Sequence, residues 1–315
     1  MLGATGTIGR ATVKALLARG HAVICAVRDP DRARACLPEG TDLRSCDVSS
    51  ANSLRKEGLR GENFDALVSC LASRSGAPAD AWAIDNGAHL VALAAARDAG
   101  VRQVVLLSAI CVQKPLLAFQ HAKLAFEATL MQSGLTYSIV RPTAYFKSLS
   151  GQLGRLRAGK PFLIFGNGEL TACKPISDAD LAAYLAGCLD DEARWNRILP
   201  IGGPGPALTP REQGELLFAA LGQAPRYRSV PVGLLDGIIA LLSLGGRFSP
   251  RLAAKAELAR IGRYYATESM LVLDPATGRY DADATPETGT DTLAAFYGRL
   301  VWGEETIDRG EHAVF

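Results

Sequence analysis

Three glycines at G-x-x-G-x-x-G spacing open the chain and have the pattern of a phosphate-binding loop. Residues 10–17, which follow them, have the apolar spacing of a helix. Glycines permit a tight turn and a close approach of the backbone to a phosphate, and a helix N-terminus offers free N–H groups and partial positive charge. The pattern therefore predicts a dinucleotide site. We expect six residues to shape it: Gly3, Thr5, Gly6, Thr7, Ile8 and Gly9.

A buried strand of about five or six residues should precede such a loop, at the centre of a parallel sheet. Only Met1 and Leu2 stand before the glycine turn. We therefore expect that the native chain starts upstream of Met1 and that its first strand is truncated in this sequence.

Apolar runs alternate with helical patterns after the loop, which is typical of parallel strands joined by crossover helices. This alternation predicts an α/β fold, a Rossmann-type doubly wound parallel sheet that forms an NADP-binding domain over residues 1–202. After the Gly-Pro-rich residues 202–206 the pattern changes to helices and loops, so a smaller substrate-covering lobe is expected over residues 203–315. Strands are expected at 21–27, 41–44, 64–71, 103–108, 136–142 and 197–201, and the clearest helices at 82–99, 120–133 and 178–189.

The residues after the second and third strands bear on the choice of cofactor. Arg28 stands where this fold faces the adenosine ribose, and an arginine suits the 2′-phosphate of NADP, whereas an acidic residue would bind the 2′-hydroxyl of NAD. The acidic Asp29 follows directly, so NAD is an alternative cofactor. A solvent-facing side chain without a cofactor contact is the alternative for Arg28. We predict NADPH, with Arg10 and Arg32 as helpers. Asp47 is expected near the adenine amine, with a surface role as the alternative.

The fourth and fifth strands lead into the residues that could carry the reaction. Cys70 ends the fourth strand, where its backbone is expected to contact the cofactor. In a typical short-chain reductase a serine follows the fifth strand, and a Tyr-x-x-x-Lys pair shares one face of the next helix. Here Ser108 and Lys123 are present, but Phe119 stands at the tyrosine position. A phenyl ring cannot donate a proton, so we expect hydride transfer to carbon, such as reduction of a conjugated C=C bond.

Several stretches outside the glycine loop are distinctive and resemble one family. The run 108–124, together with 200–206, 264–272 and 280–289, is similar to the divinyl chlorophyllide a 8-vinyl-reductases, which are atypical short-chain dehydrogenase/reductases of (bacterio)chlorophyll synthesis. The resemblance covers nearly the whole chain and departs from the family at the missing first strand. It implies NADPH-dependent reduction of the 8-vinyl group of 3,8-divinyl chlorophyllide a, or of divinyl protochlorophyllide a, to ethyl, without metal or flavin in the protein.

The resemblance also implies roles for individual residues. Lys123 would fix the nicotinamide ribose, and Ser108 would lie near the nicotinamide or substrate. Tyr145 is a candidate proton donor, with solvent as the alternative. Candidate contacts for the macrocycle and its propionate are Phe119, for which core packing is the alternative, Phe146, Lys147 and Lys114. Two other functions stay open: an NADP-binding sensor without turnover, and reduction of another conjugated alkene.

Bulk composition limits the partners. The 34 basic and 32 acidic residues give a net charge of +2, which does not favour nucleic-acid binding. Seven cysteines lie scattered without a C-x-x-C pair, as in reduced cytoplasmic proteins, and we predict no metal site. The apolar stretch 232–244 is too short to span a bilayer. We expect it to be buried, with covering of the pigment or peripheral contact with the photosynthetic membrane as alternatives.

Overall fold

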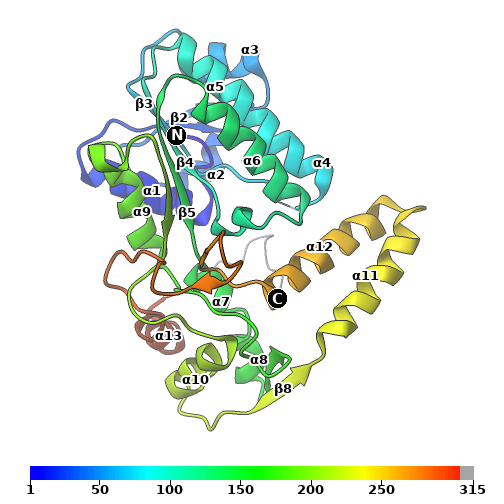
Figure 1. Ribbon diagram of the computed structural model, residues 1–315. Helices are drawn as coiled ribbons and strands as arrows, with labels where there is room; N and C mark the ends of the chain where they lie inside the picture. Colours follow the sequence, from blue (N-terminus) through cyan, green and yellow to red (C-terminus); the bar gives the residue numbers. More distant parts are fainter. Residues whose placement is uncertain (75, 306–315) are drawn as a thin grey trace. The chain divides into compact units, whose positions relative to one another are not determined.

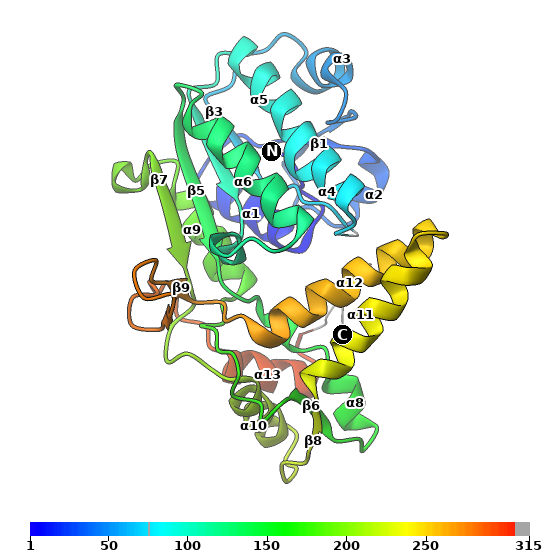
Figure 2. The ribbon, with the colours of Figure 1, turned by 45° about the vertical axis from the view of Figure 1, so that its right-hand side comes forward.

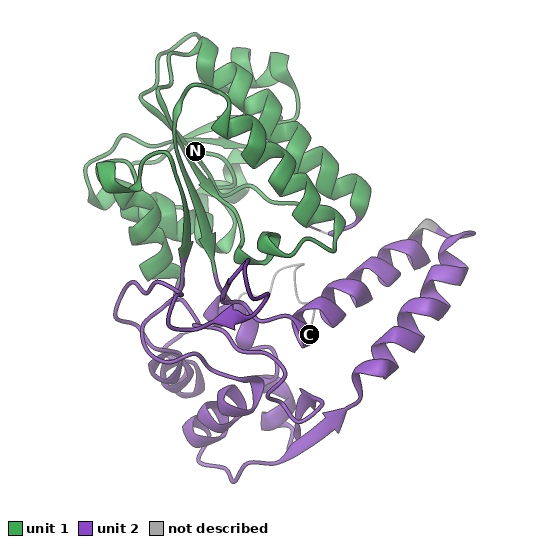
Figure 3. Cartoon of the chain, in the orientation of Figure 1, with its two compact units in different colours: residues 1–73, 78–142, 178–200 green, residues 74–77, 143–177, 201–315 purple. Residues whose placement is uncertain are grey.

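The computed structural model describes residues 1–74 and 76–305, which divide into two compact units (Figure 3). Unit 1 consists of residues 1–73, 78–142 and 178–200, and unit 2 of residues 74–77, 143–177 and the described residues from 201 onward. This division differs from the predicted boundary between residues 202 and 203, because residues 143–177 group with the second unit. The chain therefore leaves unit 1 after residue 142 and returns to it for residues 178–200.

Unit 1 alternates strands and helices, as the sequence pattern predicts. Its strands are β1 (Ile24–Val27), β2 (Asp42–Ser45), β3 (Ala66–Ser69), β4 (Gln103–Leu107), β5 (Thr136–Pro142) and β7 (Arg197–Ile201). Its helices are α1 (Thr7–Ala18), α2 (Pro30–Arg34), α3 (Ala51–Ser53), η1 (Leu54–Leu59), α4 (Pro78–Ala81), η2 (Trp82–Ala88), α5 (His89–Asp98), η3 (Ile110–Gln113), α6 (Ala118–Met131), α9 (Asp178–Gly187) and η4 (Glu192–Arg194).

Two groups of parallel strands form the core of unit 1. β1 pairs with β2, and β3, β4 and β5 pair in that order, with β7 next to β5. Helices α5 and α6 cover one face of the sheet, and α1 and α9 pack together on the other (Figures 1 and 2). Helices on both faces of a parallel sheet define a doubly wound fold. The predicted fold class is confirmed.

Met1 and Leu2 connect the two groups of strands through backbone hydrogen bonds. Leu2 N donates to Val68 O at 2.9 Å, and Cys70 N donates to Leu2 O at 3.0 Å. On the other side, Ala26 N donates to Met1 O at 3.1 Å. These two residues therefore occupy the central position that the first strand of the fold requires.

Unit 2 has short strands and more helix. Its core contains large, fully buried side chains from separate segments, including Leu156, Phe218 and Tyr297. Its strands are β6 (Phe162–Phe165), β8 (Tyr227–Val230), β9 (Val272–Leu273) and β10 (Tyr280–Asp281). Its helices are α7 (Phe146–Leu149), α8 (Leu153–Arg157), α10 (Pro210–Ala220), α11 (Val232–Gly246), α12 (Pro250–Thr267) and α13 (Leu293–Trp302).

The apolar stretch 232–244 forms most of α11, which packs against α12 as a helical hairpin (Figures 1 and 2). No residue of α11 is fully buried. The expectation of burial is therefore wrong, because apolar composition does not reveal whether a helix has neighbours on more than one side. In the part of the chain that the structure describes, no helix has both the length and the apolar character needed to cross a membrane.

Candidate functional site

The glycine loop is held closed by its own backbone. Gly3 has φ +69°, and a Cβ there would lie 2.5 Å from the backbone of Cys70. A Cβ at Gly9 would lie 2.0 Å from the carbonyl oxygen of Gly3. Gly6 has more room, because the nearest atom to its Cβ would be 3.5 Å away. Two of the three glycines are therefore required by the loop itself. Gly6 is the N-cap of α1 and places no side chain over the helix N-terminus.

The other loop residues differ in their exposure. Thr5 and Gly6 are exposed, and Thr7 is half-buried as the first residue of α1. Ile8 is only 6% exposed, so its side chain packs in the core while its N–H belongs to the first helical turn. First-turn N–H groups lack acceptors within the helix. The N-terminus of α1, which no side chain caps, thus has the local structure of a pyrophosphate site.

Arg28 follows the last residue of β1, as expected, and its side chain is exposed. Its predicted contact with the 2′-phosphate stays a prediction. The neighbouring Asp29 caps α2, because its Oδ1 accepts a hydrogen bond from Arg32 N at 3.0 Å. This capping role explains the acidic residue next to Arg28, which on the sequence alone left NAD as an alternative cofactor. Arg32 is exposed on α2, and Arg10 is half-buried on α1.

Asp47 and Cys70 both have contacts within unit 1. Asp47 Oδ1 accepts hydrogen bonds from Ser49 N at 2.9 Å and Ser49 Oγ at 2.6 Å, and these bonds hold the pKa of Asp47 below its usual value. Burial raises the pKa of the Cys70 thiol to about 12. The thiol therefore stays protonated, and the Cys70 backbone lies against Gly3. The predicted cofactor contacts of both residues stay predictions.

Lys123 forms a buried ion pair that the sequence analysis did not predict. Its Nζ lies 3.0 Å from Oδ1 of Asp85, with the two side chains 12% and 1% exposed. Asp85 Oδ1 also accepts from Ser73 N at 3.3 Å. Among the described residues, Asp85 Oδ2 is buried without a hydrogen-bond partner. Asp85 lies in the π-helix η2. Helical turns of this type are rare in proteins as a whole but are often found at functional sites.

His89 completes the buried polar group next to this pair. Its Nδ1 lies 3.0 Å from the carbonyl oxygen of Ile84, and its Nε2 lies 2.9 Å from Ser69 Oγ. Burial, together with the smaller effect of the positive charge of Lys123, lowers the pKa of His89 to about 4. Since a carbonyl only accepts, Nδ1 carries the proton of a neutral ring. The sequence analysis did not identify Asp85 and His89 as site residues. A signal for them was present, because they are two polar residues four positions apart in a largely apolar helical stretch.

Ser108 lies at the end of β4 within a second buried network. Its Oγ donates to Glu127 Oε1 at 2.5 Å, and Arg141 forms an ion pair with the other oxygen of the same carboxylate. The single hydroxyl proton of Ser108 is thereby committed to Glu127. In this arrangement Ser108 can accept a further hydrogen bond but cannot donate one.

Phe119 and Lys123 lie four residues apart on α6, and hence on one face of it. Phe119 is half-buried. The start of the helix is held by the buried Gln120, whose Oε1 accepts from Leu116 N at 2.7 Å and whose Nε2 donates to Cys111 O at 3.1 Å. The segment that carries Phe119 and Lys123 is therefore held in place by a side chain that sequence reasoning did not single out.

Tyr145, Phe146 and Lys147 belong to unit 2, whereas Lys123 and Ser108 belong to unit 1. Phe146 is 2% exposed in the core of unit 2, with its ring centroid 5.2 Å from that of Phe296. Tyr145 precedes α7, and Lys147 lies on it; both are half-buried. The structure gives Phe146 a packing role, and the predicted substrate contacts of all three residues stay predictions.

The distinctive stretches 200–206 and 280–289 meet around Lys174 in unit 2. Lys174 is buried, forms an ion pair with Glu287 and donates to Thr285 O at 3.3 Å. The second oxygen of Glu287 accepts from Gly205 N at 3.2 Å, and the bond from Lys174 lowers the pKa of Glu287. These stretches therefore share one polar network, which gives a physical reason for their distinctive sequence.

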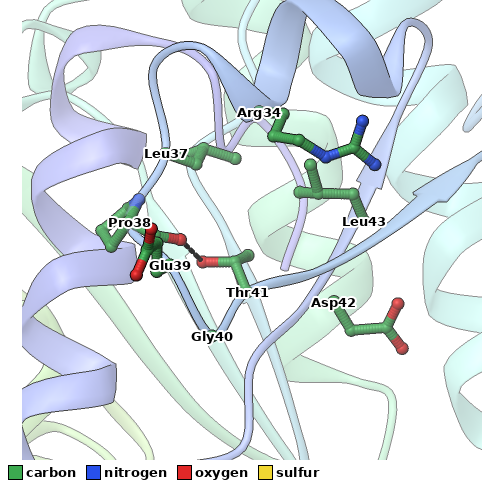
Figure 4. Close-up of a pocket in the computed structure, with 8 residues that line it drawn as sticks. All are labelled: Arg34, Leu37, Pro38, Glu39, Gly40, Thr41, Asp42 and Leu43. Atoms are coloured by element: carbon green, nitrogen blue, oxygen red, sulfur yellow. Dashed lines mark hydrogen bonds between the residues drawn. The ribbon is translucent and has the colours of Figure 1, made fainter.

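A separate hollow of about 420 Å³ lies between α2 and β2 (Figure 4). Residues 37–43 and Arg34 line it, and the Thr41 hydroxyl donates to Pro38 O at 2.8 Å. All of it comes from one short stretch of chain with several exposed side chains. None of the predicted cofactor or substrate residues lines this hollow.

Known proteins are similar to this chain over most of its length. Residues 3–192 match a family model described as NAD(P)H-binding. The "Divinyl chlorophyllide a 8-vinyl-reductase, chloroplastic" of Cucumis sativus is 48% identical over 100% of this chain and 79% of its own length. The protein of the same name from Arabidopsis thaliana is 47% identical over 96% of this chain and 76% of its own. A solved structure of the NADPH-dependent quinone oxidoreductase QOR2 from Escherichia coli, complexed with NADPH, has a TM-score of 0.66 at 21% identity, covering 95% of this chain and 98% of its own.

Proposed function

The chain belongs to the divinyl chlorophyllide a 8-vinyl-reductase family, and from this premise we propose that it uses NADPH to reduce the 8-vinyl group of 3,8-divinyl chlorophyllide a, or of divinyl protochlorophyllide a, to ethyl. The observation that carries the proposal is an identity of 48% to a relative of that name over the whole chain. An identity at this level spans both units, and not the nucleotide-binding unit alone. The substrate class is accordingly a tetrapyrrole.

Residues of unit 1 fit the cofactor. The backbone at Gly3, Gly6 and Gly9 leaves the N-terminus of α1 open for a pyrophosphate, and Thr5, Thr7 and Ile8 complete this loop. The exposed Arg28 is suited to the 2′-phosphate, since Asp29 is already used to cap α2. We assign Asp47 to the adenine end of the same site, and the backbone of Cys70 to a contact with the cofactor beside the glycine loop. NADPH, when bound, supplies a hydride to the vinyl carbon.

Lys123 would hold the nicotinamide ribose in the orientation needed for transfer. Asp85 keeps the ammonium group in place through the 3.0 Å ion pair, and Gln120 orders the start of the helix on which Lys123 lies. Ser108 accepts a hydrogen bond near the reacting group. Positioning of this kind lowers the barrier by reducing the entropy lost on reaching the reactive geometry.

The overall change adds one hydride and one proton to the vinyl group. Phe119 has no proton to give, which suits reduction of C=C rather than of C=O. We propose Tyr145 as the proton donor, with solvent as the other source. Phe119 and Phe146 are proposed as contacts of the macrocycle, and Lys147 as the partner of its propionate.

We extend the proposal to the place of action. The curated relatives from Cucumis sativus and Arabidopsis thaliana are described as chloroplastic. A tetrapyrrole substrate has a large apolar surface, so we propose that the chain works in peripheral contact with the photosynthetic membrane.

A spectral assay tests the reaction directly. Purified protein is incubated with NADPH and 3,8-divinyl chlorophyllide a, or the protochlorophyllide, and the pigments are then separated by chromatography. A blue shift of the Soret band together with monovinyl product supports the proposal. Tight NADPH binding without oxidation beside either pigment would instead indicate a nucleotide-binding sensor.

A further inference from the structure

A stripe of exposed apolar side chains runs along α11 and into the turn that follows it. Its members recur every three or four residues, and hence share one face of the helix. Leu241 is 73% exposed and Phe248 is 88% exposed, values that are high for large apolar residues. The stripe consists of Leu234, Ile238, Leu241, Leu244 and Phe248.

The other side of α11 is also apolar but has a partner. Leu235, Ile239 and Leu242 are half-buried, and α11 packs against α12. Two glycines permit close packing at the tip of the hairpin: a Cβ at Gly245 would lie 2.7 Å from Leu252 Cδ1, and one at Gly246 would lie 3.0 Å from Ala253 Cα. The stripe is therefore the unpartnered half of an otherwise packed helix.

Exposed cations accompany the stripe at the tip. Arg247, Arg251 and Lys255 are all exposed, and residues 237–256 contain no acidic residue. Within residues 1–74 and 76–305, no ion pair forms at any of these three cations.

The flanking acids of the hairpin are already paired. Asp236 forms an ion pair with Arg263, and Glu257 pairs with Arg260 at 3.0 Å. Neither acid therefore offsets the charge at the tip. The end of the hairpin thus combines a net positive charge with an exposed apolar face.

We propose that the α11 stripe, with Arg247, Arg251 and Lys255, docks on the surface of an anionic lipid membrane. An apolar face beside basic side chains is the pattern of a helix that lies in the membrane interface. The 15 residues of α11 extend about 22 Å, less than the ~30 Å hydrocarbon core, so the helix lies in the interface rather than spanning it. This inference deepens the proposed peripheral membrane contact and does not depend on the reductase reaction.

The charge pattern favours lipid over a second copy of the chain. A second copy would bring the same three cations and no acid from residues 237–256, and like charges at an interface are unfavourable. Anionic headgroups supply the complementary charge. Each basic residue near such a surface contributes about fivefold to binding.

Vesicle flotation of the full chain tests the proposal. The probes are vesicles of phosphatidylcholine alone and of phosphatidylcholine with phosphatidylglycerol. We expect binding to the anionic vesicles, at least tenfold weaker binding to the neutral ones, and release by salt. Equal binding to both vesicles, or to neither, would overturn the proposal.

Two triple variants separate the stripe from the cations. Leu241→Gln/Leu244→Gln/Phe248→Gln should abolish binding, and Arg247→Gln/Arg251→Gln/Lys255→Gln should weaken it at least tenfold. Matched controls are Leu170→Gln, at a leucine 50% exposed elsewhere in unit 2, and the charge-matched Lys160→Gln/Arg226→Gln/Arg228→Gln. Both controls should bind as the unaltered chain does. Circular dichroism and NADPH binding verify that each variant is folded.

Two further readouts assign the stripe to another occupant if the proposal is wrong. Sedimentation that shows a dimer lost in the apolar triple variant, without vesicle binding, would assign the stripe to a second copy. Reduction of free pigment lost in that variant, with vesicle binding intact, would assign it to the substrate. If instead no reductase activity is found in any sample while vesicle binding follows the expected pattern, the reaction assignment fails and the docking surface stands.

Discussion

Lys123 Nζ and Asp85 Oδ1 lie 3.0 Å apart inside unit 1, although 38 residues separate them in the chain. The carboxylate comes from a π-helix, and the ammonium group from the middle of α6. Removing one partner of a buried ion pair is costly, because the other charge is left without compensation. The pair therefore fixes where Lys123 points, and the proposed role of Lys123 depends on Asp85.

Lys123→Ala should lower kcat/KM for vinyl reduction by about 100-fold or more, since both the ribose contact and the orientation it provides are lost. Lys123→Arg keeps the charge and should retain part of the activity. Pigment chromatography after timed incubation with NADPH measures both variants, and thermal unfolding monitors the fold. Full activity of the alanine variant would falsify the assignment of Lys123.

Asp85→Asn should act on the reaction through Lys123. The amide keeps the size of the side chain but removes the charge that holds the ammonium group, so we expect kcat to fall about tenfold or more while the KM for the pigment changes little. Steady-state kcat and KM are measured beside those of Glu62→Gln, a matched change at a partner of the buried Arg44 in the same unit, which should keep kcat. An Asp85→Asn variant that loses thermal stability but keeps kcat would show that Asp85 has only a structural role.

Phe119→Tyr restores the Tyr-x-x-x-Lys spacing of carbonyl reductases, yet it should not increase vinyl reduction. The proposed reaction needs no proton from this position, so we expect activity within about threefold of the unaltered chain. Phe119→Leu serves as the control for ring packing at this half-buried site. A large gain in the tyrosine variant alone would mean that a proton donor at this position limits the reaction.

Arg28→Gln should shift the preference from NADPH toward NADH. Loss of a hydrogen-bonded charge partner costs about 1.5–3 kcal/mol, so the Kd for NADPH should rise roughly 10- to 100-fold while that for NADH stays nearly constant. Fluorescence titration with each nucleotide measures the ratio. Arg97→Gln, at another exposed arginine of unit 1, should leave the ratio unchanged. Equal weakening for both nucleotides would argue against recognition of the 2′-phosphate by Arg28.

Local sequence signals predicted the elements that local chemistry determines. The glycine spacing indicated the phosphate loop, and β5 and β7 have the predicted bounds. The expected strand over 64–71 is shorter, at Ala66–Ser69, and the expected helix over 82–99 begins as a π-helix. Apolar runs continue beyond the hydrogen-bonded part of an element, so periodicity fixes the type of an element better than its ends.

Contacts between residues far apart in the sequence could not be predicted from local patterns. Lys123 and Asp85, like Ser108 and Glu127, meet only when separate segments pack together. The exposure of α11 was missed because its composition is that of a buried helix, and only the fold shows that one side of it has no neighbour. The grouping of residues 143–177 with unit 2 likewise depends on contacts that no local pattern records.

His89 should make stability depend on pH between about 6.5 and 4. The pKa of the buried ring is lowered from 6.5 to about 4. Between these two pH values the His89 ring is therefore protonated in the unfolded state but stays neutral in the folded state. Stability is therefore full above about pH 6.5 and falls as the pH drops toward 4, by about 3 kcal/mol in total. Urea unfolding of the unaltered chain at pH 7.5 and pH 4.5, followed by circular dichroism, should show this loss in addition to that of the carboxylates.

His89→Gln keeps a polar side chain without the titrating ring, and Phe126 then loses a ring neighbour that lies 4.7 Å away between centroids. The variant should be less stable at pH 7.5 but lose less stability on acidification, so that the two curves converge near pH 4.5. His121→Gln, on the exposed side of α6, is the matched control and should follow the unaltered chain at both pH values. A pH dependence of His89→Gln as steep as that of the control would mean that the acid sensitivity arises from other groups of the chain.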